Sequence, residues 1–268
     1  MRVRVRACLA RLRERSTSIS LQAVNVGSGP HWAGLPFWAS YDLELGQRFT
    51  ELSKLPYEDN SIEKIFSSHF VEHLTLREAR NFLEEAFRVM KPGAVLRIVC
   101  PDIESLSGAV THSGLNPTPP LALSRPSGWG DLPIELCPIF FVSHLACHYE
   151  ERVVRSDGSF TTYRRPPPIA KDELREILTL DVSLIHERLM EKVPEKMRGS
   201  VLHKSCWGIS NLGTEAVSAG FQFEKSSYLA SRSLQFKYLD YTHGRRSISL
   251  WADLLKPNDE GLGTACTT

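Results

Sequence analysis

The sequence lacks long apolar runs, paired cysteines and an excess of either charge. Its most apolar stretches, such as residues 94–100, are far shorter than the roughly 20 residues that a membrane-spanning helix needs, so no segment is expected to cross a bilayer. A formal net charge of +1 also leaves little for a broad basic face that would neutralise phosphates. Nucleic acid is therefore not an expected partner.

The cysteines show no pairing pattern. No CxxC motif and no regular spacing occur among Cys8, Cys100, Cys137, Cys147, Cys206 and Cys266. This argues against a disulfide framework and against a structural zinc site. A reducing cytoplasm is the expected location.

The residues that are present fit a soluble enzyme of ordinary composition. Hydrophobic residues make up 42% of the chain and charged residues 24%, and 268 residues can bury a core of their own. Arginine is concentrated at the start, where residues 1–19 contain a single acid, Glu14. This arm has the composition of a transit peptide or of a basic helix lying against the domain, and we prefer the helix.

Strand and helix patterns alternate through the first hundred residues. Strands are predicted at 21–26, 39–42, 62–68 and 94–100, with a helix at 76–90 between the last two. Thr75 and Glu78 form the sequence signature of a capping box at the start of that helix, and Lys91-Pro92-Gly93 favours its end. The alternation predicts an α/β fold with a mostly parallel sheet and helices on both faces.

The texture changes in the second half of the chain. Residues 107–205 are proline-rich and read as an insertion rather than as more sheet, with one helix at 171–191. A helix at 210–219 and strands at 221–229 and 247–255 follow, and residues 258–268 read as a flexible tail. We therefore expect one domain over residues 1–268, with the insertion as a structured cover.

A glycine turn and an acid suggest a nucleoside site. Gly27 and Gly29 follow the first strand, where backbone can approach a ligand closely, and Asp42 ends the second strand, where a carboxylate can bind a ribose diol. The dinucleotide fingerprint needs a third glycine at the position of Trp32. A nicotinamide dinucleotide is thus the weakest of the cofactor interpretations.

These residues, taken together, resemble the class I S-adenosylmethionine (SAM)-dependent methyltransferases. The resemblance is carried by Val24-Asn25-Val26-Gly27-Ser28-Gly29, by Tyr41-Asp42 and by residues 55–62, 67–74 and 85–102. It covers residues 20–106, and 219–221 and 247–256 are similar to the last helix and strand pair of the family. Within the class the chain is most similar to small bacterial predicted methyltransferases of glycan or secondary-metabolite pathways. The resemblance implies a Rossmann-like, mostly parallel seven-stranded sheet with an antiparallel last strand, helices on both faces and a lid-like insertion.

The resemblance also implies which residues bind the cofactor. The implied cofactor-binding set is Asn25, Gly27, Ser28, Gly29, Asp42, Glu51, Leu52, Ser67, Ser68 and His73. The glycine turn would line the methionine part of SAM. Asp42, or Glu44 in its place, would bind the ribose, and Glu51 and Leu52 would hold the adenine. His31 stands where another glycine is common in the family, which departs from the usual motif.

Three residues are candidates for catalysis. His69 follows a strand that faces the site and can act as a general base, or pack as a structural histidine. Asp102 can orient an acceptor or simply cap a helix, and His203 follows the insertion and can return over the site. His144, Cys147 and His148 suggest a metal because of the i, i+4 histidine pair, but no further ligands lie nearby in sequence, so no metal is expected.

The sequence therefore predicts a SAM-dependent methyltransferase that acts on oxygen of a small-molecule or glycan-type acceptor and releases S-adenosylhomocysteine. Methyl transfer from a sulfonium is an in-line displacement, so alignment of the two reactants is the main requirement. Two alternatives keep the fold: a non-catalytic partner subunit, and an enzyme for another reaction such as cyclisation. The acceptor itself is read by the insertion, in which no motif is matched.

Overall fold

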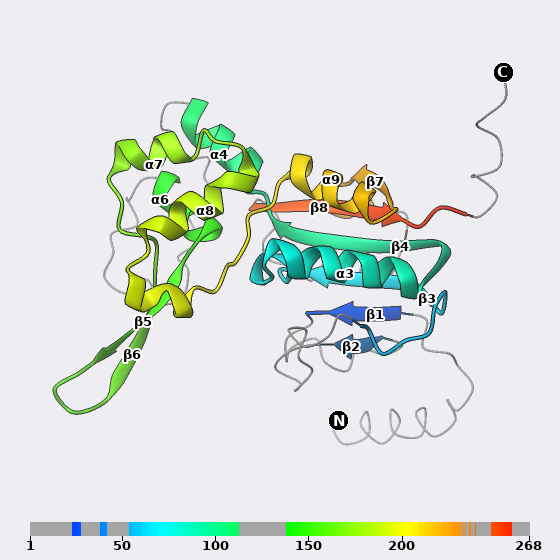
Figure 1. Cartoon of the computed structure of the whole chain (residues 1–268), viewed down its shortest axis with the longest axis horizontal. Coiled ribbons are helices and arrows are strands. Elements are labelled where there is room, and N and C mark those ends of the chain that lie inside the picture. Colours follow the sequence, from blue (N-terminus) through cyan, green and yellow to red (C-terminus); the bar gives the residue numbers. More distant parts are fainter. Residues whose placement is uncertain are drawn as a thin grey trace.

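A six-stranded mixed sheet forms the centre of the molecule (Figure 1). The computed structural model describes residues 23–27, 38–41, 54–112, 138–231, 233, 236, 239 and 248–258. The strands are β1 (Ala23–Val26), β2 (Ala39–Tyr41), β3 (Ile62–Ser68), β4 (Met90–Pro101), β7 (Gln222–Lys225) and β8 (Ser249–Leu255). Their order across the sheet is β2-β1-β3-β4-β8-β7.

The sheet has the directions expected from the sequence. β2, β1, β3 and β4 are parallel to their neighbours, whereas β8 runs antiparallel to both β4 and β7. The fold is α/β and Rossmann-like, and the antiparallel strand near the C-terminus is confirmed. This sheet has no seventh strand in the part of the chain that the structure describes. The next strand along the chain, β2, lies on one side of β1, and β3 lies on the other side. The strand order therefore reverses between β1 and β3, which is where ligands bind in open α/β sheets.

Helix α3 (Leu76–Val89) forms as its capping signature predicts. The Thr75 hydroxyl accepts a hydrogen bond from the Glu78 backbone N–H, and the Glu78 carboxylate accepts one from the Thr75 N–H at 2.8 Å. The helix ends one residue before its predicted end because Met90 is already the first residue of β4. Gly93 takes a φ of +77° inside that strand. The sequence therefore predicted the beginning of α3 better than its end.

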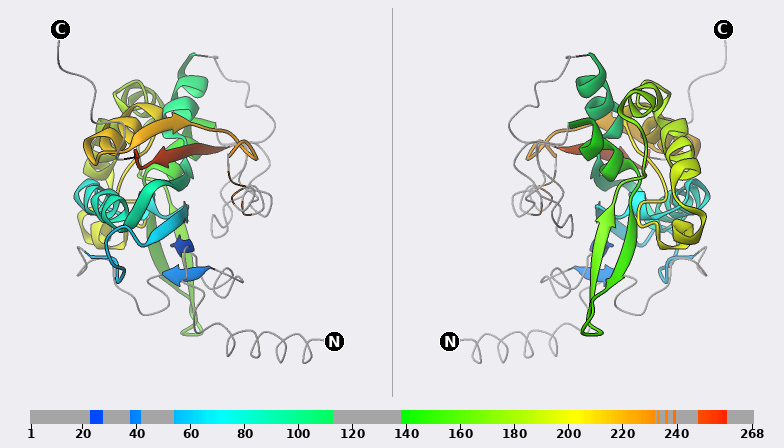
Figure 2. Two further views of the ribbon diagram at one scale, coloured as in Figure 1. Left: turned by 90° about the vertical axis from the view of Figure 1, so that its right-hand side faces the viewer. Right: turned by 90° about the vertical axis from the view of Figure 1, so that its left-hand side faces the viewer.

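Different elements cover the two faces of the sheet (Figure 2). Helices α3 and α9 (Ile209–Ser218) pack on one face over a core that includes Val24, Ile65, Leu96 and Ala252. On the other face Phe66, Val99 and Trp251 pack against Phe236 and Leu239, which come from the segment between β7 and β8. The expected strand at 221–229 is shorter in the structure, since β7 ends at Lys225. Among the described residues no helix is long and apolar enough to span a membrane.

The insertion forms a second lobe with its own hydrophobic core (Figure 1). Its elements are α4 (Ile103–His112), α6 (Pro138–Ala146), β5 (Tyr149–Val154), β6 (Phe160–Arg165), α7 (Lys171–Ile177), α8 (Val182–Lys192) and the 3-10 helix η4 (Glu195–Ser200). Figure 1 shows this lobe beside the edge of the sheet toward which the β1 arrow points. The insertion therefore stands at the carboxyl ends of the parallel strands.

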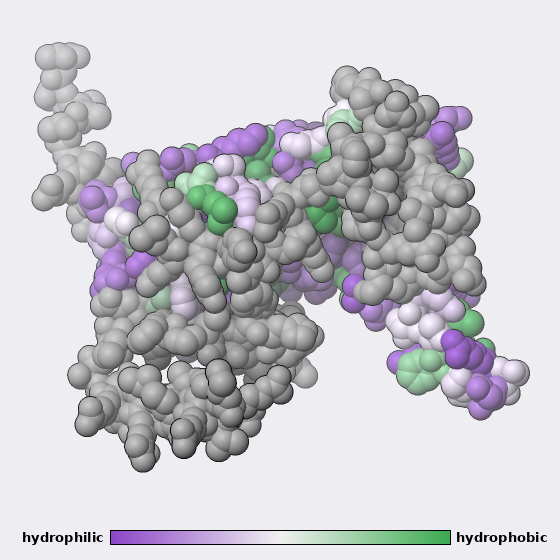
Figure 3. All heavy atoms as spheres, turned by 180° about the vertical axis from the view of Figure 1, so that it is seen from behind, coloured by the Kyte–Doolittle hydropathy of each residue, from purple (hydrophilic) through white to green (hydrophobic). Residues whose placement is uncertain are grey.

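Two expectations for the insertion were wrong. The single helix predicted at 171–191 is two helices, because the chain breaks after Ile177 and restarts at Asp181, whose carboxylate accepts a hydrogen bond from the Ser183 N–H at 2.9 Å. The insertion also contains sheet, since β5 and β6 form an antiparallel hairpin. This hairpin projects from the lobe and exposes Val154 and Phe160 among polar neighbours (Figure 3).

The described cysteines, Cys100, Cys147 and Cys206, are buried and form no disulfide.

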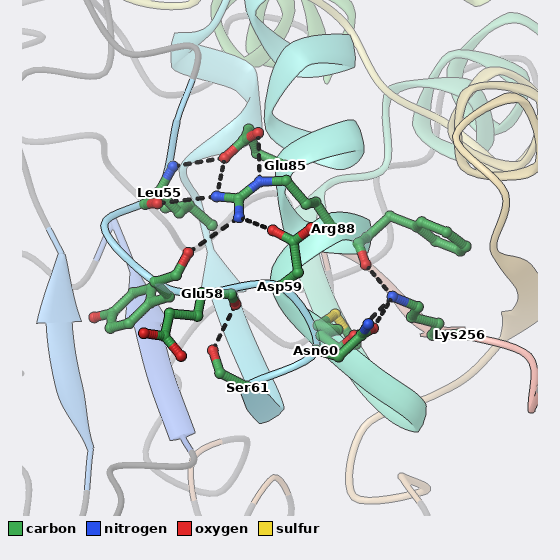
Figure 4. A network of polar contacts seen from close by, with 11 residues as sticks. Leu55, Glu58, Asp59, Asn60, Ser61, Glu85, Arg88 and Lys256 are labelled. Atoms are coloured by element: carbon green, nitrogen blue, oxygen red, sulfur yellow. Dashed lines mark hydrogen bonds and ion pairs between the residues drawn. The ribbon is translucent and has the colours of Figure 1, made fainter.

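A polar network fixes the loop before β3 (Figure 4). Arg88 of α3 donates hydrogen bonds to the backbone oxygens of Leu55 and Tyr57, both at 3.1 Å, and to Asp59 at 2.5 Å. Glu85, paired with Arg88 at 2.7 Å, accepts a further bond from the Leu55 N–H at 2.8 Å. These contacts position the chain that directly follows the expected adenine-binding residues 51–52.

One buried ion pair connects the strands at the centre of the antiparallel part of the sheet. Arg97 of β4 lies 2.6 Å from Asp253 of β8, and the two side chains are 0% and 3% exposed. The guanidinium also donates hydrogen bonds to the Ser226 hydroxyl and the Ser227 backbone oxygen. The charges are thus compensated by partners on both β8 and the segment after β7.

We expect Arg97→Met to lower the free energy of unfolding by about 3–5 kcal/mol, because it leaves a buried carboxylate without its partner. Adding Asp253→Leu should recover most of the loss, since both charges are then removed. Urea unfolding followed by circular dichroism measures both effects. Arg188→Met, in the exposed pair with Glu191 on α8, is the control and should change stability by less than about 1 kcal/mol. An equal, small loss in both single variants would contradict the prediction.

Candidate active site

The carboxyl ends of β1 and β3 meet at a glycine turn. Val26 is paired with Ser67, and Gly27 follows with a φ of +72°. A Cβ on Gly27 would lie 2.5 Å from the side chain of Phe70, so only glycine fits between this turn and the chain after β3. Asn25 and Ser67 are buried beneath the turn, and the Ser67 hydroxyl is without a hydrogen-bond partner in the described structure. This edge therefore holds an unsatisfied polar atom beside a turn that allows close backbone approach.

The expected cofactor residues are only partly described. Asn25, Gly27, Ser67 and Ser68 lie together at this edge. Ser28, Gly29, Asp42, Glu51 and Leu52 lie outside the described residues.

His69 has an unusual backbone conformation directly after β3. Its φ is +50°, in the left-handed region that a histidine rarely adopts, and its N–H donates to the Val99 backbone oxygen at 2.7 Å. Such conformations cost on the order of 1–3 kcal/mol and persist where the surroundings fix them. The side chain is 8% exposed and lies between two partners, with Nδ1 3.0 Å from Glu72 Oε1 and Nε2 3.1 Å from Ser249 Oγ. The strained backbone thus directs the imidazole into a defined polar arrangement.

Glu72 is a buried carboxylate that sequence reasoning did not single out. It lies on the short 3-10 helix η3 (Val71–His73) and is 2% exposed. Burial alone raises its pKa, but His69, and after it His203 and His73, outweigh that effect and lower the pKa to about 2. Glu72 is therefore ionised at neutral pH. Its position three residues after His69 was the available signal, because the two side chains meet across the turn that leads into η3.

His73 and His203 meet at the junction of the sheet with the insertion. Their rings lie 4.9 Å apart, and each Nδ1 is bonded to a backbone oxygen, that of Leu202 at 3.0 Å for His73 and that of Leu145 at 2.5 Å for His203. The segment around His203 is docked on η3, since the Lys204 N–H donates to the Glu72 backbone oxygen at 2.7 Å. The chain thus returns from the insertion to η3 at His203, and the His73 ring contacts Leu202 and His203 of that segment.

Two more histidines extend this group into the insertion. His144 and His148 stack at 4.3 Å at the end of α6, and the His148 ring lies 4.4 Å from that of His203. Burial is the main cause that lowers the pKa of His144 to about 2, of His203 to about 3 and of His148 to about 4, so these imidazoles are neutral. We refer to Glu72, His73, His144, His148 and His203 as the histidine cluster. Its members come from segments up to 131 positions apart, so spacing along the sequence could not reveal it.

Asp102 is placed as a helix cap. Its carboxylate accepts a hydrogen bond from the Ser105 N–H at 3.1 Å at the start of α4, and its own N–H donates to the Ile248 backbone oxygen. The capping interpretation describes these contacts fully. A role toward an acceptor remains a proposal.

Residues 40–98 match the family model of the methyltransferase domain. The chain carries a methyltransferase domain. This match covers β2, β3, α3 and most of β4, and it confirms the expected class of enzyme, for which SAM is the methyl donor. No curated protein matches the sequence.

Solved structures of methyltransferases resemble the chain over most of its length. A SAM-dependent methyltransferase from Mesorhizobium loti is 12% identical over 90% of this chain and 94% of its own, with a TM-score of 0.38. The CcbJ methyltransferase from Streptomyces caelestis is 9% identical over 92% and 88%, with a TM-score of 0.41. The glycopeptide N-methyltransferase MtfA, in complex with S-adenosylhomocysteine, is 12% identical over 92% and 86%, with a TM-score of 0.38.

The buried histidines make stability dependent on pH. Burial lowers the pKa of His144 and His148 in the folded state, whereas in the unfolded chain both have the ordinary histidine pKa of 6.5. Below pH 6.5 the unfolded chain therefore binds more protons than the folded chain does. The free energy of unfolding is therefore highest above pH 6.5 and decreases as the pH falls, by up to about 2 kcal/mol for each histidine at pH 5. Urea unfolding at pH 7.5 and pH 5 measures this loss. His148→Gln should make it smaller, and equal unfolding free energies at the two pH values would refute the assignment.

Proposed function

We propose that this chain transfers a methyl group from SAM to an oxygen atom of a small-molecule or glycan-type acceptor in the cytoplasm. The observation that carries the proposal is the methyltransferase-domain match over residues 40–98, which begins in β2 and ends in β4. The insertion at 107–205 stands at the carboxyl ends of these strands (Figure 1) and would cover the acceptor.

The described residues of the β1–β3 edge fit the cofactor. Gly27 turns the chain at the end of β1 with a φ of +72°, and the buried Ser67 hydroxyl offers an unsatisfied donor and acceptor beside it. The proposed binding set assigns Gly27, Ser28 and Gly29 to the methionine part and Asp42 to the ribose. In the same set Glu51 and Leu52 hold the adenine. When bound, SAM supplies an electrophilic methyl group on a sulfonium.

His69 is the proposed general base. Its Nδ1 faces the ionised carboxylate of Glu72, which fixes the tautomer with the proton on Nδ1 and leaves Nε2 as the basic nitrogen. Nε2 now lies 3.1 Å from the Ser249 hydroxyl, which is the distance at which a base accepts a proton from an oxygen. An acceptor hydroxyl in the equivalent position would transfer its proton to Nε2 as its oxygen forms the new bond to the methyl carbon.

His203 and Asp102 have different proposed parts. The His203 ring is 7% exposed and bonded through Nδ1 to Leu145, so we assign it to positioning the insertion on η3. Asp102 directly follows β4, at the same edge of the sheet as the β1 turn. It would orient the acceptor while it caps α4.

The cofactor assignment is tested by isothermal titration with S-adenosylhomocysteine. Asp42→Ala should weaken binding by about 10–100-fold, since it removes charge-assisted hydrogen bonds to the ribose. Asp172→Ala is the matched control, because Asp172 is an exposed aspartate of α7 and its loss should leave binding unchanged. No binding to the wild type, or the same affinity in both variants, would sink the assignment.

The base is tested by separating turnover from binding. His69→Gln should lower the rate of methyl transfer by about 10²–10⁴-fold while the affinity for S-adenosylhomocysteine stays within about threefold. The rate is measured by mass spectrometry after incubation of the protein with methyl-labelled SAM and extracts of the source organism, as label-dependent gain of one methyl group. Binding of the cofactor by the wild type without any labelled product would instead favour a non-catalytic subunit.

A further inference from the structure

Three potential metal ligands meet at the junction of the sheet and the insertion. One ligand atom each from Glu72, His73 and His203 lies within 4.8 Å of the other two. Glu72 and His73 are consecutive residues of η3, and His203 comes from the segment that returns from the insertion. Glu72 and His203 are buried, and His73 is half-buried.

The hydrogen bonds of this group leave the ligand atoms available. Nδ1 of His73 and Nδ1 of His203 donate to backbone oxygens, so Nε2 of each ring carries a free lone pair. Glu72 faces His69 through Oε1, whereas Oε2 has no hydrogen-bond partner within the described residues. Metal-binding histidines typically donate their second ring N–H to a carbonyl or carboxylate in this way, which fixes the ring and makes the other nitrogen more basic.

A fourth imidazole gives independent support. His148 is 3% exposed and its Nδ1 donates to the His144 backbone oxygen at 3.0 Å, while Nε2 is buried and unpartnered in the described structure. Its ring packs edge-to-face on that of His203 at 4.4 Å. A buried nitrogen lone pair without a donor is costly, and an ion beside His203 would satisfy it directly or through a bound water.

We propose that Glu72 Oε2, His73 Nε2 and His203 Nε2 bind a divalent transition metal ion of the zinc class, with His148 adjacent to it. Two imidazoles and one carboxylate are a donor set for Zn²⁺ and its first-row neighbours, whereas Mg²⁺ and Ca²⁺ prefer oxygen ligands only. The ion would connect η3 of the sheet domain to the insertion through His203, and its charge would compensate the buried carboxylate.

Metal binding by the full-length protein tests the proposal without any acceptor or cofactor. The chain is treated with a chelator, dialysed and titrated with Zn²⁺ by calorimetry, and the bound metal is counted by elemental analysis. We expect about one ion per chain and a rise in the thermal unfolding temperature with Zn²⁺ concentration, since an ion that binds only the folded state stabilises it. No binding by the folded wild type would overturn the proposal.

Variants assign the ligands. Glu72→Gln, His73→Gln and His203→Gln should each weaken Zn²⁺ binding by at least about 100-fold. His186→Gln is the matched control, because that ring contacts the His203 backbone oxygen but offers no ligand atom to the group. Its affinity should stay within about tenfold of the wild type, and equal affinities in all four variants would overturn the assignment.

Spectroscopy on the wild type covers the case in which a variant does not fold. X-ray absorption at the zinc edge should show nitrogen and oxygen ligands with the scattering pattern of two or three imidazoles. Sulfur ligands would overturn the proposal, since they would place the ion at the buried Cys147 and Cys206 instead. Binding of S-adenosylhomocysteine is measured separately, so failure of the metal site and failure of the methyltransferase assignment are distinguishable.

Discussion

The carboxylate of Glu72 is the group on which the junction between sheet and insertion depends. A buried ionised carboxylate costs several kcal/mol unless charges or hydrogen bonds compensate it, and Glu72 is 2% exposed. Its side-chain partner is His69, with Nδ1 3.0 Å from Oε1, the rings of His73 and His203 lie close by, and its backbone oxygen accepts a hydrogen bond from the Lys204 N–H. Movement of the insertion away from η3 would break the Lys204–Glu72 backbone hydrogen bond and separate His203 from η3. A residue of the sheet domain thus lies at the point where the insertion docks on η3.

The same turn explains why His69 tolerates an unfavourable backbone. The left-handed φ of His69 is maintained by its N–H bond to Val99 of the neighbouring strand and by the two side-chain partners of its ring. Close behind it, Phe70 packs so tightly against Gly27 that no side chain fits at that position. The glycine turn of β1 and the strained residue after β3 are therefore two halves of one packing arrangement, which brings the proposed cofactor turn and the proposed base together.

Local signals in the sequence predicted the sheet domain well. The capping box of Thr75 and Glu78, the apolar run of β3 and the glycine after β1 each depend on residues a few positions apart, and each formed as expected. The end of α3 and the break between α7 and α8 were missed, because tertiary packing rather than local propensity decides them. The hairpin of the insertion was missed as well, because its strands carry mixed polar and apolar residues, although Asp157-Gly158 between them is a turn signal and Gly158 has a φ of +82°.

The candidate site was predictable only where it follows the order of the strands. Residues at the ends of β1 and β3 could be placed because carboxyl ends of parallel strands share one edge. The histidine cluster could not, because its histidines come from η3, from α6 and from the segment after η4, and their meeting is a property of the folded insertion. The metal interpretation of His144 and His148 was set aside because no ligand lies nearby in sequence, while in space His148 packs on His203.

One carboxylate therefore links the two chemical proposals. Oε1 of Glu72 faces the proposed base, His69, and Oε2 is the atom assigned to the ion. A cation at Oε2 would therefore share one carboxylate with the imidazole of His69, so a substitution at Glu72 would disturb both proposed roles. Because His203 would reach that ion from the insertion, the proposed ion and the proposed base both depend on how the segment after η4 packs on η3.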